Sequence, residues 1–169
     1  MKEFFLGCDA SKGYGDFVII DAKKKTMVES FQLDDTYTGH NCLYQQLESF
    51  LKLHPGARLS AGIESTGGYE NNWYSAFVRF GASINMRIAH INPVGIGHDS
   101  KAERQRNITD KISARNIAEY MIRHPKKVNF ATDNPMIGLK RQWRHISLLD
   151  KQIVQLSNHL EILVYTSNP

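Results

Sequence analysis

Short apolar runs separated by polar turns fill the N-terminal part of the chain. The runs are Phe4–Asp9, Phe17–Asp21 and Thr26–Leu33, and each has the length and composition of a β-strand. The letters SKGYGD join the first run to the second, and AKKK joins the second to the third. Because connections this short favour antiparallel pairing, the pattern predicts a three-stranded meander.

Further along the chain, helical and strand patterns alternate. Apolar residues at positions 43, 47, 50, 51 and 53 follow a helical rhythm, which ends at the letters HPG. The expected elements are a helix over Gly39–Leu53, a strand over Leu59–Ile63, a helix over Gly68–Phe80 and a strand over Ile84–Ile91. Strands that alternate with helices pair in parallel through right-handed crossovers. The whole pattern predicts an α/β fold: a ribonuclease-H-like (RuvC-like) mixed five-stranded sheet with flanking helices.

The remainder of this domain consists of a loop and a helix. Residues 93–107 are glycine-bearing, charged and aperiodic, which is typical of a loop. Helical rhythm resumes over Thr109–Met121, with Thr109 as a suitable N-cap. We expect the domain to span residues 1–125.

The C-terminal segment, residues 133–169, has a heptad pattern. Its apolar positions are separated by 7, 3, 4, 3, 4 and 3 residues. They are Leu139, Ile146, Leu149, Ile153, Leu156, Leu160 and Leu163. The spacing is typical of a coiled-coil seam, although a long helix folded back on the domain would show it too. We expect a long C-terminal coiled-coil helix that forms a homodimer or a larger assembly.

Composition narrows the class of protein. The chain has 169 residues, of which 41% are hydrophobic and 22% charged, as in ordinary globular proteins. No apolar run reaches the roughly 18 residues of a membrane span, and the N-terminal apolar stretch is too short for a signal peptide. Cys8 and Cys42 lack metal-ligand spacing and fit reduced thiols. We therefore expect a cytoplasmic protein without a membrane partner.

Positive charge is concentrated in one segment. Residues 101–127 hold eight basic and three acidic side chains, a net charge of +5 in a chain whose total is +4. The basic residues expected to bind nucleic acid are Lys101, Arg104, Arg106, Lys111 and Arg115. A concentrated basic patch suits a polyanion such as DNA, although a solvated helix face is an equally good explanation of the charge alone.

Three acidic residues stand at positions that the predicted topology brings together. Asp9 ends the first strand, Glu64 ends the fourth strand, and Asp110 begins the helix after the loop. Carboxylates held close together repel one another unless a cation lies between them, and Mg²⁺ prefers such oxygen ligands. The alternative is that these acids cap turns and helix N-termini, where acids are common.

At these residues a family resemblance is visible. The stretches GCDASKGYGDFVIID, GIESTGGY and TDKISARNIAEY together resemble the N-terminal domain of the DEDD insertion-sequence transposases, which include pilin-gene invertases and bridge-RNA-guided recombinases. The resemblance covers roughly residues 4–123. It implies DNA strand cleavage and exchange with Mg²⁺ (or Mn²⁺), and places Asp9, Glu64 and Asp110 as the metal-binding acids. It also implies DNA as a partner, with a guide RNA in some members.

The chain departs from the family pattern at the fourth acid. The family usually carries Asp three residues after its third acid, and here that position is Ser113. A hydroxyl is a weaker ligand than a carboxylate, so the resemblance implies catalytic roles for Asp9, Glu64, Asp110 and Ser113 with metal bound mainly by the first three. In the family a coiled coil leads to a second domain with a nucleophilic serine, so we expect this chain alone to be incomplete for transposition.

Two other functions remain open at this point. One is a catalytically degenerate module that binds DNA or guide RNA, in which Ser113 marks a lost site. The other is an ATPase of the sugar-kinase and actin type, which the missing glycine in Asp9-Ala10-Ser11 disfavours.

Two further acids and five aromatic residues could also belong to a functional site. Asp16 and Asp99 could substitute for the missing fourth acid only after local rearrangement, and we expect Trp143 to pack at the start of the coiled coil more than to stack on a base. Four aromatic residues at helical spacing are expected to serve core and interface packing more than a base-stacking platform: Tyr69, Trp73, Tyr74 and Phe77.

Overall fold

The chain divides into two compact units in the computed structural model. The structure describes residues 2–65, 67–92, 110–130 and 136–167. The first unit is Met1–Ala131 and the second is Thr132–Pro169. Each unit is described by itself.

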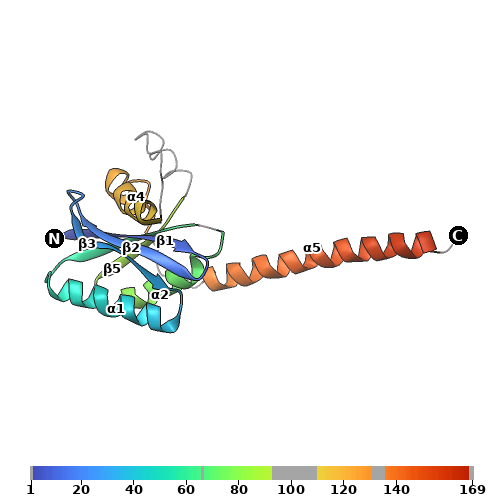
Figure 1. Cartoon of the computed structure of the whole chain (residues 1–169). Coiled ribbons are helices and arrows are strands. Elements are labelled where there is room, and N and C mark those ends of the chain that lie inside the picture. Colours follow the sequence, from blue (N-terminus) through green and yellow to red (C-terminus); the bar gives the residue numbers. More distant parts are fainter. Residues whose placement is uncertain (1, 66, 93–109, 131–135, 168–169) are drawn as a thin grey trace. The chain divides into compact units, whose positions relative to one another are not determined.

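A five-stranded mixed sheet forms the centre of the first unit (Figure 1). Its strands are β1 (Glu3–Ser11), β2 (Tyr14–Asp21), β3 (Thr26–Asp34), β4 (Arg58–Glu64) and β5 (Met86–Ile91), in the order β3-β2-β1-β4-β5. The pairs β1–β2 and β2–β3 are antiparallel, and the pairs β1–β4 and β4–β5 are parallel. This is the predicted combination of a meander with two parallel strands.

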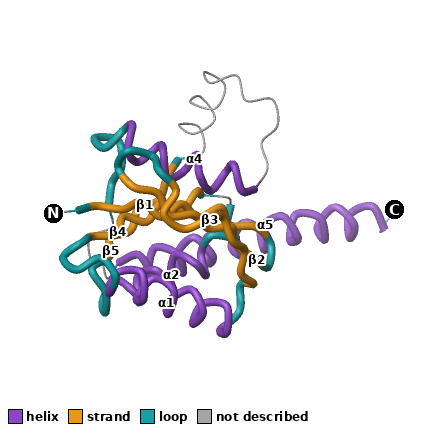
Figure 2. Tube along the Cα trace, turned by 60° about the vertical axis from the view of Figure 1, so that its left-hand side comes forward, coloured by secondary structure: helices purple, strands orange, loops and turns teal. Residues whose placement is uncertain are grey.

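Helices cover both faces of the sheet, as Figure 2 shows. Helices α1 (Tyr37–Lys52) and α2 (Asn71–Gly81) lie on one face, and α4 (Asp110–Arg123) lies on the other. Side chains along a strand alternate between the faces, so Phe4 and Leu6 pack towards α1 and α2 while Phe5 packs towards α4. The central strands of the sheet are therefore buried on both sides.

Two elements begin at other residues than the apolar pattern predicted. Strand β2 begins at Tyr14 and not at Phe17, because Ser11 and Tyr14 pair across a tight turn in which Gly13 has a φ of +89°. Helix α2 begins at Asn71 and not at Gly68, because Gly67 and Gly68 both have positive φ values. The expected N-cap, Thr109, lies outside the described residues.

The second unit is one long helix, α5 (Met136–Ser167), of 32 residues. Its apolar positions are exposed within the single chain, including Ile153 at 61% and Leu156 at 62%. Among the helices that the structure describes, none is long and apolar enough to cross a membrane.

Candidate active site at the carboxyl edge of β1 and β4

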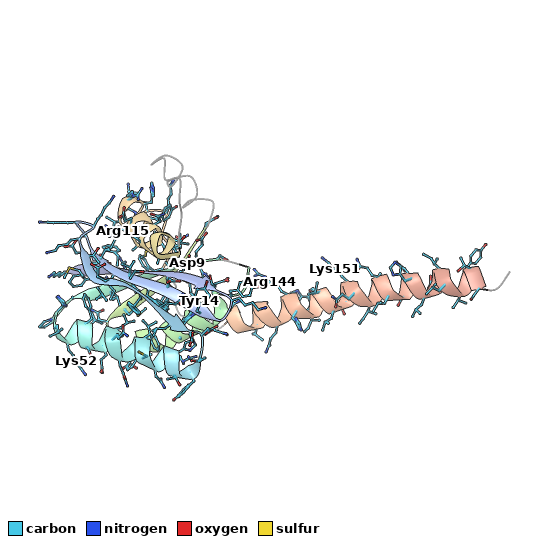
Figure 3. The ribbon with its side chains drawn as sticks, in the orientation of Figure 1. Asp9, Tyr14, Lys52, Arg115, Arg144 and Lys151 are labelled. Atoms are coloured by element: carbon cyan, nitrogen blue, oxygen red, sulfur yellow. The ribbon has the colours of Figure 1, made fainter. Side chains whose placement is uncertain are left out.

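Two carboxylates lie at the same edge of the sheet. Strands β1 and β4 are parallel, and their last paired residues are Cys8 and Ile63. Asp9 and Glu64 follow directly, so they stand side by side where the two strands leave the ladder. The alternation that sends Cys8 and Ile63 towards α1 and α2 sends both acids to the opposite face. Figure 3 shows Asp9 on the side of the sheet that carries α4.

The electrostatics of Glu64 reflect this proximity. Burial raises the pKa of Glu64, and the negative charge of Asp9 raises it further. Both effects favour the neutral acid, so ionised Glu64 is unfavourable beside ionised Asp9. A divalent cation between them would remove this conflict, and the oxygen donors present are those that Mg²⁺ prefers.

A third acid, Asp16, lies at the same edge. It pairs directly with Asp9 across β1 and β2 and is only 2% exposed. Its Oδ2 accepts a hydrogen bond from Nε2 of Gln32 at 3.3 Å. The expectation that Asp16 could serve as a metal ligand only after local rearrangement stays a prediction, since Asp9, Asp16 and Glu64 do not form a group that could hold a metal ion as they stand. The strand pairing already places it opposite Asp9, on the face that carries α4.

The negative character of this edge extends through the sheet. The pKa of the Cys8 thiol is raised well above its usual value, first by burial and then by the charges of Asp9, Asp16 and Asp35. Cys8 is therefore an inert, protonated thiol in the core, as expected for a buried cysteine.

Helix α4 brings its N-terminal half over the sheet next to these acids. The helix packs with its Ala114 backbone directly against Gly7 on β1, two residues before Asp9. Ser113 is half-buried beside Ala114, and Asn116, a residue that sequence reasoning missed, is buried one turn later. Nothing in the sequence indicated that Asn116 is buried, because a single polar residue within a helical pattern is common. The side chain of Asp110, the first residue of α4, lies outside the described part of the structure.

The residues with described side chains do not by themselves complete a metal site. Among them, no three His, Cys, Asp or Glu side chains form a group that could hold a metal ion. Asp9 and Glu64 supply two carboxylates of suitable chemistry. The third acid expected from the sequence, Asp110, is not among the described side chains, so the set of three stays a prediction.

Of the basic residues expected to bind nucleic acid, only Arg115 has a described side chain. Lys101, Arg104, Arg106 and the side chain of Lys111 lie outside the described residues. Arg115 is described, and its three guanidinium nitrogens donate hydrogen bonds to Glu119, Thr26 and the Lys24 carbonyl. The bonds to Thr26 and Lys24 hold α4 to the turn between β2 and β3 and the start of β3.

The aromatic residues of α2 and the loop before it separate into two groups. Trp73, Tyr74 and Phe77 are buried in the core, as predicted. Tyr69 is 53% exposed and lies outside the core, so packing at an interface stays a prediction for this residue. The helical spacing does not include Tyr69, because α2 begins two residues after it.

The fold and the acid pair define a class of protein: a ribonuclease-H-like domain with carboxylates at the carboxyl edge of its central strands. Two solved structures are similar to this chain. T. thermophilus RuvC in complex with a Holliday junction substrate has a TM-score of 0.55 and 8% sequence identity, and the match covers 76% of this chain and 99% of that chain. A second Thermus thermophilus RuvC structure has a TM-score of 0.49 and 10% identity, with coverage of 76% and 99%. The first of these structures confirms the RuvC-like fold predicted from the sequence.

Residues 6–169 match the IS110-type DEDD transposase family, which is described as "Transposase". The chain belongs to this transposase family. This confirms the resemblance seen in the sequence. No curated relative matches the chain.

Proposed function

We propose that this transposase domain performs metal-dependent DNA strand cleavage and exchange, with Asp9, Glu64 and Asp110 as the metal-binding residues. The observation that supports it most is the placement of Asp9 beside Glu64, where the charge of Asp9 raises the pKa of Glu64. A divalent cation bound between the two carboxylates would make their close placement favourable.

The residues have distinct roles in this proposal. Asp9, two residues before the end of β1, and Glu64, the last residue of β4, provide carboxylate oxygens, and Asp110 provides a third from the start of α4. Mg²⁺ or Mn²⁺ held there would polarise a phosphate and support attack at a neighbouring phosphodiester bond. Ser113, at the position of the family's fourth acid, contributes a neutral oxygen directly or through water. With this weaker fourth ligand, the site would hold one metal ion well and not two.

DNA is the proposed partner. A guide RNA is also a polyanion and would bind to the same surface. Lys101, Arg104, Arg106 and Lys111 are the proposed phosphate contacts, since their segment carries the excess positive charge of the chain. Arg115 was included in this set from the sequence. Its bonds to Glu119, Thr26 and Lys24 support a role in fixing α4 that is independent of nucleic acid.

The second unit is proposed to associate with another copy. Residues 133–169 would form a coiled coil beside a catalytic domain over residues 1–125, because the apolar seam of α5 is exposed in the single chain.

Calorimetric titration with Mg²⁺ and Mn²⁺ tests the metal assignment. The wild-type chain should bind the ion, and Asp9→Ala, Glu64→Ala and Asp110→Ala should each weaken binding severely. Glu48→Ala is a matched control, because this carboxylate lies on α1 and pairs with Lys52 at 2.8 Å. Wild-type affinity in all three site variants would exclude this site. A chain that binds nucleic acid but no metal would instead be the degenerate binding module.

A further inference from the structure

Asp16 on β2 lies directly opposite Asp9 on β1. The two residues are partners in the antiparallel ladder, where the Cβ atoms of opposite residues are roughly 4.5–5.5 Å apart. Partners in a ladder point to the same face, and Val18, two residues further along β2, packs in the cluster that α4 covers. Asp16 therefore shares with Asp9 both the face and the edge of the sheet at which the metal site is proposed.

This placement of Asp16 is unfavourable for the protein alone. The residue is 2% exposed, and burial of a carboxylate is costly unless the charge is compensated. Like charges directly opposite one another in a ladder are also destabilising. Gln32, the partner of Asp16 on β3, donates a hydrogen bond from Nε2 to Oδ2 of Asp16 at 3.3 Å. This neutral amide orients the carboxylate of Asp16 but brings no positive charge to offset that of Asp9.

Asp16 does not join Asp9 and Glu64 as a direct ligand in this arrangement. Within the described part of the chain, no three His, Cys, Asp or Glu side chains form a group that could hold one metal ion. Mg²⁺, however, retains several water molecules when carboxylates bind it. Acceptor groups outside the ligands orient such sites and raise their affinity for metal. A buried carboxylate on the strand next to Asp9 is suited to this role.

We propose that Asp16 is a positioning residue for the ion at the Asp9–Glu64 edge, where its carboxylate accepts hydrogen bonds from water that the ion retains. The inference rests on the proposed function and adds a residue to its site. Asp16 supplies a negative charge from β2 in a chain that has a neutral hydroxyl at Ser113, the position of the family's fourth acid. Because Asp16 acts through water, its loss weakens metal binding without abolishing it.

Asp16→Asn tests this role, since it keeps the size of the side chain and an oxygen for Gln32. Calorimetric titration should give a Mg²⁺ affinity about 10- to 100-fold lower than that of the wild type. In a chelating buffer the same variant should melt at a higher temperature than the wild type, because a buried charge opposite Asp9 has been removed. This gain should be smaller in an Asp9→Asn background. A residue that served packing alone would give no such opposite changes in metal affinity and metal-free stability.

Asp21→Asn is the matched control. It neutralises an acid at the other end of β2, where Oδ1 of Asp21 accepts the backbone N–H groups of Lys23 and Lys25, and it should leave Mg²⁺ affinity unchanged.

The failure of this inference is distinguishable from the failure of the proposed function. Wild-type Mg²⁺ affinity in Asp16→Asn, with binding lost in Asp9→Ala, would overturn the role of Asp16 and leave the metal site in place. Loss of binding as complete as in Asp9→Ala would make Asp16 a direct ligand and overturn a role through water. A lower melting temperature of metal-free Asp16→Asn would also overturn the inference, because the carboxylate would then stabilise the fold. A wild-type chain that binds no divalent ion would overturn both.

Discussion

Gly7 on β1 lies so close to Ala114 on α4 that a Cβ atom on Gly7 would come 1.8 Å from the Ala114 carbonyl oxygen. No side chain other than hydrogen is compatible with this packing. A second glycine, Gly62 on β4, lies under the same helix, where a Cβ would meet the Met121 sulfur at 2.9 Å. The glycines thus set the height of α4 above the sheet, and with it the distance of Ser113 and Asp110 from Asp9.

Gly7→Ala should therefore displace α4 and have two effects. Overpacking should lower the free energy of unfolding by about 1–3 kcal/mol, measured by urea denaturation. Mg²⁺ affinity should also fall, because the helix that carries Asp110 moves away from Asp9 and Glu64. Gly56→Ala is the control: with a φ of +74° and open space around it, it should destabilise by strain without altering Mg²⁺ affinity. A Gly7→Ala chain with unchanged stability would contradict the close packing.

The stability of the metal-free domain should depend on pH through Glu64. Burial and the charge of Asp9 raise the pKa of Glu64 in the folded state, so ionisation of Glu64 opposes folding. Its favourable contribution is complete below the unfolded pKa of about 4.3 and is lost as pH rises through the folded pKa. Without divalent ions, Glu64→Gln should be more stable than the wild type at neutral pH, and the difference should disappear under acidic conditions.

Thermal melts in a chelating buffer over a series of pH values measure this effect. Asp9→Asn should give part of the same gain, since it removes the second cause of the raised pKa. Glu48→Gln, at the exposed pair with Lys52, is the control for a neutralised carboxylate elsewhere. If Glu64→Gln is less stable than the wild type at neutral pH, the carboxylate makes favourable contacts that the proposed repulsion omits.

The sequence was sufficient to predict the strand order and the meeting of Asp9 with Glu64, because both follow from connection length and from the parallel pairing of β1 with β4. It did not indicate that Asp16 pairs with Asp9, for a physical reason. Hydrophobic periodicity detects burial of side chains, whereas β2 continues to Tyr14 through backbone hydrogen bonds that leave no apolar signal. Tyr69 lies outside the core for a related reason, since the aromatic spacing extends past a boundary that two glycines impose on the backbone.

Self-association should depend on the apolar seam of α5. Ile153→Asp with Leu156→Asp places charges at two seam positions, so this double variant should be a monomer where the wild type is a dimer or larger. Gln155→Asp with Asn158→Asp adds the same charges to the same helix outside the seam and should leave the assembly intact. Sedimentation velocity distinguishes the two results. A wild-type chain that stays monomeric at high concentration would exclude the coiled coil.

Ser113 is the position where the chain differs from its family, and its replacement tests whether α4 completes the metal site. Ser113 is half-buried on α4, one turn after Asp110 and next to the Ala114 that contacts Gly7. Residues three apart on a helix lie on the same side, so Ser113→Asp should add a carboxylate beside that of Asp110. Mg²⁺ affinity should rise, because coordination of a divalent cation by an added anion outweighs the repulsion among the carboxylates.

Two comparisons make the Ser113 result decisive. Ser113→Asn adds an oxygen of similar reach without charge, so it should raise Mg²⁺ affinity less than Ser113→Asp. In the absence of metal the order should reverse: Ser113→Asp should be less stable than Ser113→Asn, since a further carboxylate then joins Asp9 and Glu64 without a cation. Equal Mg²⁺ affinity in the wild type and both variants would show that Ser113 does not face the metal. Higher affinity together with no cleavage of DNA would mean that this domain binds nucleic acid without cutting it.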